Sequence, residues 1–138
     1  MSDVEALAVS MAIFSRIVDQ ARTLRDNAHR GKSPALASAY KQYAGTVDSV
    51  ASRPWQEREM SKEEEAGLDK VELAYFVDVA RGVQTAGRST GQPAKFLQEY
   101  NQRSTVIGTL ADKDWQKGQL EVEEYIALCK VAESIGSR

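Results

Sequence analysis

Two side chains that often serve in catalysis or metal binding, His29 and Cys129, each occur once in the sequence. One cysteine cannot form a disulfide within the chain, and one His with one Cys cannot complete a usual zinc site. We expect His29 in the last turn of a helix, where the helix dipole favours a cation, and Cys129 on an apolar helical face as a small buried residue. Phosphate loops, dinucleotide fingerprints and serine elbows are absent from the sequence. We therefore predict that the protein has no catalytic residues, cofactor or metal and is not an enzyme.

One short segment invites comparison with the calcium loop of an EF-hand. Counted from Asp112, the third, fifth and twelfth positions are Asp114, Gln116 and Glu123, which have the oxygen-bearing side chains that such a loop needs. However, Lys117 occupies the sixth position, where the sharp turn requires glycine. A capped helix start at Asp114 explains these acids better, and we expect no calcium site.

An internal repeat is the most informative pattern in the sequence. Between positions 40 and 71, ten of 32 residues are identical to the residues 60 positions later: Tyr40, Gln42, Ala51, Trp55, Gln56, Glu63, Glu64, Leu68, Lys70 and Val71. At an offset of 59 the match continues upstream, where Val18-Asp19, Ala21-Arg22 and Pro34-Ala35 recur as Val77-Asp78, Ala80-Arg81 and Pro93-Ala94. The repeat predicts a duplicated unit of about 60 residues, consisting of helix, tryptophan corner and helix, with its copies at roughly 18–71 and 77–131.

The repeated tryptophan corners are Trp55-Gln56 and Trp115-Gln116. A large ring suits the end of two antiparallel helices, because it can close the hairpin while its N–H stays near polar atoms. We expect both rings to close helix ends. The alternative is that these four residues form two equivalent aromatic subsites for a ligand or a peptide.

A second group of candidate binding residues is basic. Arg22, Arg25 and His29 share a face near the end of the first predicted helix and are able to hold an acidic partner or a phosphate group. A solvated positive helix end is the more ordinary interpretation.

The repeated Asp-x-x-Arg pairs, Asp19 with Arg22 and Asp78 with Arg81, have a spacing that puts each pair on one helix face. We expect ordinary surface pairs, each stabilising its helix by about 0.2–0.5 kcal/mol. The alternative is a partly buried polar layer that fixes how the helices pack.

The elements that must position these residues are helical throughout. Proline occurs at Pro34, Pro54 and Pro93, where one helix is expected to give way to the next. Apolar spacing of three and four, with capping signals, predicts helices at about residues 3–29, 34–52, 61–85, 93–112 and 121–135. The stretch Val71 to Val83 is apolar nearly all round, which is typical of a central helix buried on several sides. The predicted fold is therefore an all-α bundle of about five helices.

Composition is that of an ordinary globular domain, with 138 residues, 42% of them hydrophobic, and 18 basic against 20 acidic side chains. We expect a single helical domain spanning residues 1–138. The net charge of −2 argues against a nucleic-acid binder, and no apolar run is long enough to cross a membrane. With one cysteine and no basic-then-apolar signal sequence, the chain is expected to be soluble and cytoplasmic.

These observations favour a non-enzymatic protein-binding module, of the adaptor, chaperone or inhibitor kind, whose partner is another protein. One alternative is a self-assembling structural subunit, a homo-oligomer in which helices bearing Tyr40 and Tyr43 form the interface. A second alternative is a small helical ligand carrier or enzyme that uses the two tryptophan corners.

Overall fold

The computed structural model describes residues 17–53, 61–89 and 91–136, and within these ranges the chain is helical with no strand. The helices are α2 (Ile17–His29), α3 (Pro34–Ala51), α4 (Lys62–Gly87), α5 (Ala94–Ala111) and α6 (Val122–Gly136). The predicted all-α bundle is confirmed. Residues 3–16, the first part of the first predicted helix, lie outside the described residues.

The helix boundaries follow from local signals. Ser61 and Glu64 form a complete capping box at the start of α4, in which each side chain accepts a hydrogen bond from the other's backbone N–H. After α2 the chain turns at Gly31, whose φ of 72° is a conformation that suits glycine. Pro34 occupies the first turn of α3, as its position before an apolar run predicts.

The cap of α3 differs from the expected one. Ser33 makes no side-chain cap, although its place before Pro34 suggested one. Instead, the carboxylate of Asp78, far along the chain on α4, accepts the backbone N–H groups of Ala35 at 3.2 Å and Leu36 at 2.8 Å. A carboxylate from a neighbouring helix therefore satisfies the free donors at this helix start and ties α3 to α4.

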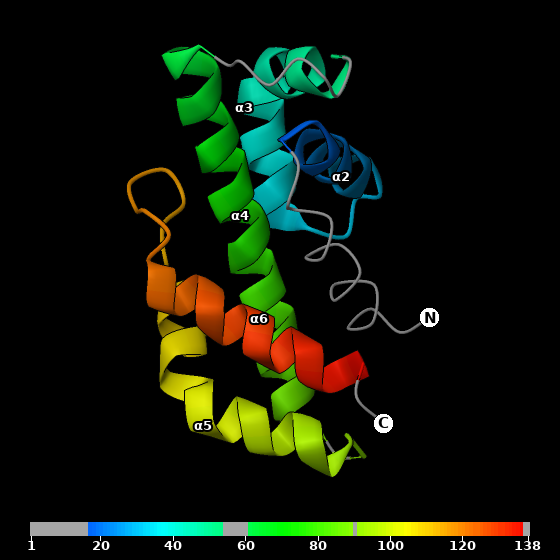
Figure 1. Ribbon diagram of the computed structural model, residues 1–138, viewed down its shortest axis with the longest axis vertical. Coiled ribbons are helices and arrows are strands. Elements are labelled where there is room, and N and C mark those ends of the chain that lie inside the picture. Colours follow the sequence, from blue (N-terminus) through cyan, green and yellow to red (C-terminus); the bar gives the residue numbers. More distant parts are fainter. Residues whose placement is uncertain (1–16, 54–60, 90, 137–138) are drawn as a thin grey trace.

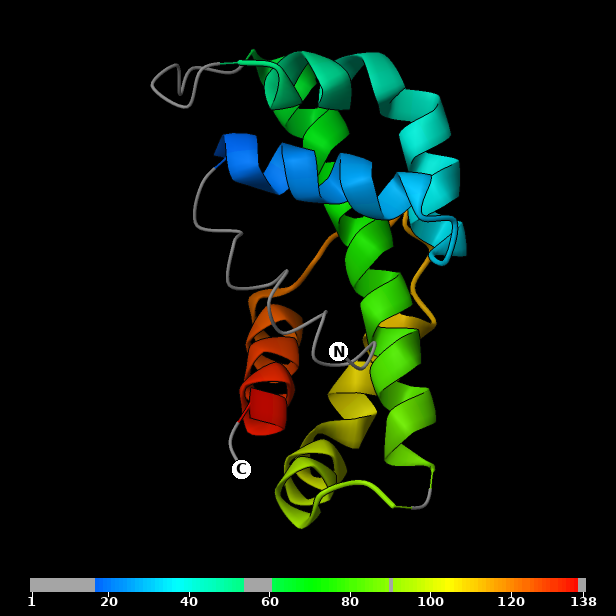
Figure 2. The ribbon, with the colours of Figure 1, turned by 90° about the vertical axis from the view of Figure 1, so that its right-hand side faces the viewer.

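Helix α4 is the axis of the molecule. In two perpendicular views, α2 and α3 pack on its N-terminal half, and α5 and α6 pack on its C-terminal half (Figures 1 and 2). The main contacts follow chain order, α2 on α3, α3 on α4, α4 on α5 and α5 on α6, with a smaller contact between α2 and α4. The central role predicted for the apolar stretch within α4 is confirmed.

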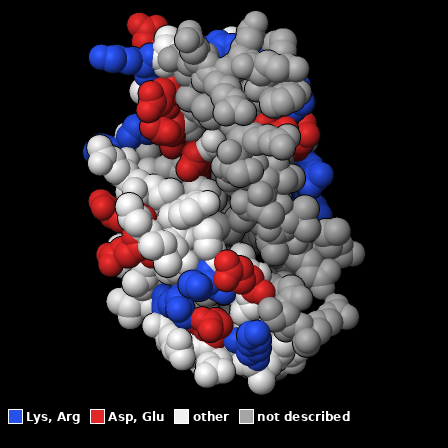
Figure 3. Space-filling view, viewed as in Figure 1, with Lys and Arg blue, Asp and Glu red and all other residues white. Residues whose placement is uncertain are grey.

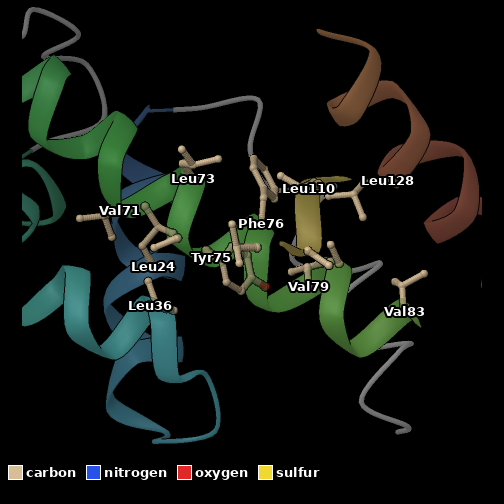
Figure 4. Close-up of a cluster of buried hydrophobic side chains, with 14 of the residues drawn as sticks. Leu24, Leu36, Val71, Leu73, Tyr75, Phe76, Val79, Val83, Leu110 and Leu128 are labelled. Carbon is tan, nitrogen blue, oxygen red and sulfur yellow. The ribbon is translucent and has the colours of Figure 1, made fainter. Parts of the chain in front are cut away.

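The buried side chains form one continuous cluster. Leu24 of α2 and Leu36 of α3 lie at one end of it, and Leu110 of α5 and Leu128 of α6 lie at the other (Figure 4). The space between them is filled by side chains of α4: Val71, Leu73, Tyr75, Phe76, Val79 and Val83. Because α4 supplies apolar residues to both halves, neither half has a separate core.

Several structural features recur at the offset of the sequence repeat. The guanidinium Nε of Arg22 donates to the carbonyl of Ala51 at 2.9 Å, and that of Arg81 donates to the carbonyl of Ala111 at 3.0 Å. Glycines with positive φ recur at Gly31 and Gly91. The side chains of Glu64 and Glu124 each accept a hydrogen bond from the backbone N–H three residues earlier. Each of these glutamates also forms an ion pair, Glu64 with Arg53 and Glu124 with Lys113. The internal duplication itself stays a prediction.

Helix α5 is continuous to Ala111, close to its predicted end, with Gly108 inside it. Helix α4 extends to Gly87, slightly beyond its predicted end. At Gly87 helix α5 lies very close, since a Cβ there would be 2.4 Å from the ring of Tyr100. Only glycine allows these two helices to approach this closely.

Candidate functional site

A cavity of about 550 Å³ lies between the N-terminal half of α4 and the loop that joins α5 to α6. We call it the α4 groove, and its volume falls within the range of about 300–1,000 Å³ that is common for ligand sites. Figures 1 and 2 show this loop rising from the end of α5 to the middle of α4. The groove is lined by Ala66, Asp69, Lys70, Glu72 and Leu73 of α4 and by Gly118, Gln119 and Leu120 of the loop.

Two lysines hold the loop that forms one wall of the groove. Lys70 Nζ donates to the carbonyl of Gly118 at 3.1 Å, and Lys113 Nζ donates to the carbonyl of Gln119 at 2.7 Å. Lys113 also pairs with Glu124, whose Oε1 accepts the backbone N–H of Glu121 at 2.8 Å. The loop therefore has a set position against α4, although it contains no regular helix or strand.

The other wall carries two carboxyl groups with altered acidity. Burial, together with the neighbouring carboxylate of Asp69, raises the pKa of Glu72 to about 7. Burial and the charge of Glu65 raise the pKa of Asp69 above its usual range. In both cases desolvation disfavours the charged form and a like charge disfavours it further.

Neither groove carboxylate is paired with a cation among the residues that the structure describes. Lys70 lines the same cavity, but the hydrogen bond it makes is to the carbonyl of Gly118. Asp69 is exposed, whereas Glu72 is partly buried. A partly buried carboxylate normally has a cationic partner, because an uncompensated charge away from water is costly. This arrangement is suited to binding a positively charged group.

The carboxyl groups of Asp69 and Glu72 are also of a type that serves in catalysis. A carboxyl with a pKa near 7 in a cleft is a suitable general acid or base. The other polar side chains of the lining are those of Asp69, Lys70 and Gln119.

The tryptophan corners are described only in part. Trp55 and Gln56 lie outside the described residues. Trp115 is half-buried and packs against the hydrophobic core, as expected for a ring that closes a helix end. Gln116 is exposed, and its backbone N–H donates to Asp114 Oδ1 at 2.9 Å.

The basic residues Arg22, Arg25 and His29 each have a different partner in the structure. Arg22 uses its Nε to cap the end of α3 at Ala51, and Arg25 contacts the adjacent Asp26 at 3.3 Å. His29 is exposed, and its ring meets that of Tyr40 edge-on at 5.3 Å. Tyr40 in turn donates to Asp48 at 2.6 Å, and burial together with this hydrogen bond raises its pKa to about 12.

The pair Asp78 and Arg81 also acts differently from the surface pair that its spacing predicted. Arg81 lies 3.9 Å from Asp78, but its Nε donates to the end of α5 and the Asp78 carboxylate caps the start of α3. The side chain of Asp78 is 7% exposed, so this is an interhelical contact. These charged groups lie at helix ends because those ends carry unsatisfied donors and acceptors.

The calcium-like segment is organised around an ammonium group. Lys113 donates to the carbonyl of Gln119 and to Glu124, and these two contacts hold the segment against the start of α6. Asp114 caps a single turn, and α6 begins only at Val122, so the helix start expected at Asp114 is corrected to an isolated turn. Within the described ranges no group of three His, Cys, Asp or Glu side chains is arranged to hold a metal ion.

Cys129 is half-buried on the inner side of α6 and packs against the core. Burial raises the pKa of its thiol, so the reactive thiolate is disfavoured near neutral pH. Cys129 is therefore less buried than expected, but it lies in the expected apolar environment.

The residues of the α4 groove were not among the binding residues that the sequence predicted. The available signal was the presence of Asp69 and Glu72 beside an otherwise apolar stretch of a helix expected to be buried. Carboxylates in such a position are candidates for altered pKa values and for function. The loop residues opposite them carried no comparable signal.

The fold and the site define an all-α protein in which one long helix connects two helical layers and forms one wall of a partly acidic groove. No family model matches the chain, and no curated protein or solved structure matches it either. Among the described helices, none combines the length and apolarity needed to cross a membrane.

Proposed function

We propose that this chain is a non-enzymatic protein-binding module, of the adaptor, chaperone or inhibitor kind, and that the α4 groove is its docking surface. The observation that carries this proposal is the pair of groove carboxylates, Asp69 and Glu72, which have no cationic partner in the described structure. Burial disfavours the ionised form of Glu72 and so destabilises the free protein, and proteins retain such a cost at sites where activity needs it. A docked partner that brings positive charge would remove this destabilisation.

The class and location of the partner follow from charge and composition. An acidic groove repels phosphate backbones, and the net charge of −2 lacks the basic excess of nucleic-acid binders, so we propose another protein as partner. A single cysteine suits a reducing compartment, so we propose the cytoplasm as the location.

A second candidate function, self-assembly, is favoured by two apolar side chains on α6. Val122 is 75% exposed and Ile126 is 50% exposed, and their spacing places them on one face of the helix. Contacts between copies of the chain through this face would cover both residues. The two candidate functions use different surfaces, so they can be tested separately.

Site-specific crosslinking tests the docking surface directly. A photo-reactive amino acid at position 119, where Gln119 is exposed in the groove wall, is expected to trap one discrete protein in cells of the source organism. The matched control is position 105, where Thr105 is exposed on α5 and does not line the groove. Equal products at both positions, or none at position 119, would contradict the proposal.

A further inference from the structure

The acidic wall of the α4 groove extends beyond its two lining carboxylates. Glu65, Asp69 and Glu72 follow at spacings of four and three, which place them along one face of α4. Each is close enough to the next to raise its pKa, Glu65 acting on Asp69 and Asp69 on Glu72. In the space-filling view, acidic side chains follow the N-terminal half of α4 on the side of the loop (Figure 3).

This row of carboxylates has no compensating cation in the described part of the chain. None of the ion pairs there includes Glu65, Asp69 or Glu72. Two other carboxylates of the same helix do have partners, since Glu64 pairs with Arg53 and Asp78 caps α3. The groove side of α4 therefore carries three carboxylates that are in no ion pair of the described structure.

The groove also has an apolar part. Leu73 lies on α4 between the acidic residues and the core, and Leu120 faces the groove from the loop, with Ala66 one turn before Lys70. Lysine and arginine carry long aliphatic stems that pack on such surfaces while the charged head reaches polar groups. A basic side chain therefore matches both parts of the groove, whereas a simple metal ion would meet only two carboxylates there.

We propose that the α4 groove binds a segment of a partner protein through lysine or arginine side chains, whose stems lie on Ala66 and Leu120 and whose charges meet Asp69 and Glu72. This inference rests on the proposed function and names the chemistry of the partner. Two basic side chains one helical turn apart match the spacing of the two carboxylates.

Proton uptake by Glu72 makes this binding dependent on pH. The groups that bear on Glu72 are Asp69 and Lys70 on α4 and Tyr125 on α6, whose own pKa is raised by burial, by Cys129 and by Glu72. The pKa of Glu72 is about 7, so its charge changes between pH 6 and pH 8. Because the ionised form attracts a cation, affinity falls as the pH is lowered from about 8 to about 6.

Peptide binding measured by fluorescence anisotropy tests the inference on the full chain. The probe is a labelled peptide of sequence LKALKALK, and its uncharged counterpart is LQALQALQ. The site variant is Asp69→Asn/Glu72→Gln, and the matched control is Asp112→Asn/Glu123→Gln, which removes the same charge at exposed positions outside the groove. Thermal melts establish that each variant is folded, and both amide substitutions conserve side-chain shape.

We expect the site variant to bind LKALKALK about tenfold more weakly than the natural sequence, and the control variant to differ by less than about twofold. We also expect LQALQALQ to bind about tenfold more weakly, and the pH dependence to vanish in the site variant. Equal affinity of the natural sequence for both peptides, or equal losses in both variants, would overturn the inference. If position 119 still traps a partner while Asp69→Asn/Glu72→Gln binds the lysine peptide normally, the docking surface stands and the basic-segment inference fails.

Discussion

At the scale of single residues, Glu72 has the clearest predicted effect on stability. Its pKa is about 7 in the folded protein against an ordinary 4.5, so the folded state holds this proton more tightly than the unfolded chain. The free energy of unfolding gained from this proton is fully present below pH 4.5 and is lost as the pH rises through 7. We expect Glu72→Gln to raise the free energy of unfolding at pH 8 by about 1–3 kcal/mol, and to change it little at pH 4.

Urea melts at the two pH values check this expectation. Glu121→Gln is the control, because it makes the same change at an exposed residue of the nearby loop and is expected to stay within about 0.5 kcal/mol of the natural protein. An equal gain at both pH values would show that ionisation of Glu72 is not the cause.

Trp115 tests whether a tryptophan corner is structural. The ring is half-buried against the core, so Trp115→Ala should cost about 1–3 kcal/mol of unfolding free energy, less than the 3–5 kcal/mol typical of a fully buried aromatic. Gln116→Ala, at the exposed neighbour, should cost under about 0.5 kcal/mol. Denaturant melts measure both. If Trp115→Ala left stability unchanged, the ring would become a candidate recognition residue.

At the scale of elements, the arginines that cap helix ends allow a test of the repeat. Arg22 and Arg81 make the same hydrogen bond to the ends of α3 and α5, at Ala51 and Ala111. If the two units are duplicates, Arg22→Gln and Arg81→Gln should each lower the unfolding free energy by about 1 kcal/mol. The control is Lys41→Gln, which changes an exposed side chain of α3. Thermal melts that show a loss for one arginine alone would argue against equivalent units.

The α5–α6 loop gives a second element-scale prediction. Lys117 occupies the sixth position of the calcium-like segment, where a calcium loop requires glycine, and within the described ranges no group of three His, Cys, Asp or Glu side chains is arranged to hold a metal ion. We expect the same melting temperature in millimolar calcium and in excess chelator. Differential scanning calorimetry measures this, and a rise of several degrees with calcium would contradict it, because a ligand of the native state must stabilise that state.

At the scale of the whole molecule, oligomeric state separates the two candidate functions. The exposed apolar residues of the described structure, Val122 and Ile126, form a small patch, whereas stable interfaces bury about 1,200–2,000 Å². We therefore expect static light scattering to give the monomer mass of 15.2 kDa independent of concentration. A mass that rises with concentration, and returns to the monomer value in Val122→Ser/Ile126→Ser, would favour self-assembly through α6.

The helices were predictable from the sequence because their signals are local. The Ser61–Glu64 capping box, the glycine turn at Gly31 and the prolines at Pro34 and Pro93 act within a few residues. The apolar run within α4 predicted its central place for the same reason, since a helix apolar on most faces must be covered on most faces.

The sequence by itself determined the helical class, the approximate helix boundaries and the central helix, since these depend on backbone preferences and on the spacing of apolar residues. Only the tertiary structure decided that Asp78 caps α3, that Arg22 and Arg81 cap α3 and α5, and that α4 meets the loop around Gly118. The groove depends on this last contact, between Lys70 and a carbonyl 48 residues along the chain. Contacts of this kind depend on how helices pack together, and no local pattern of residue types specifies them.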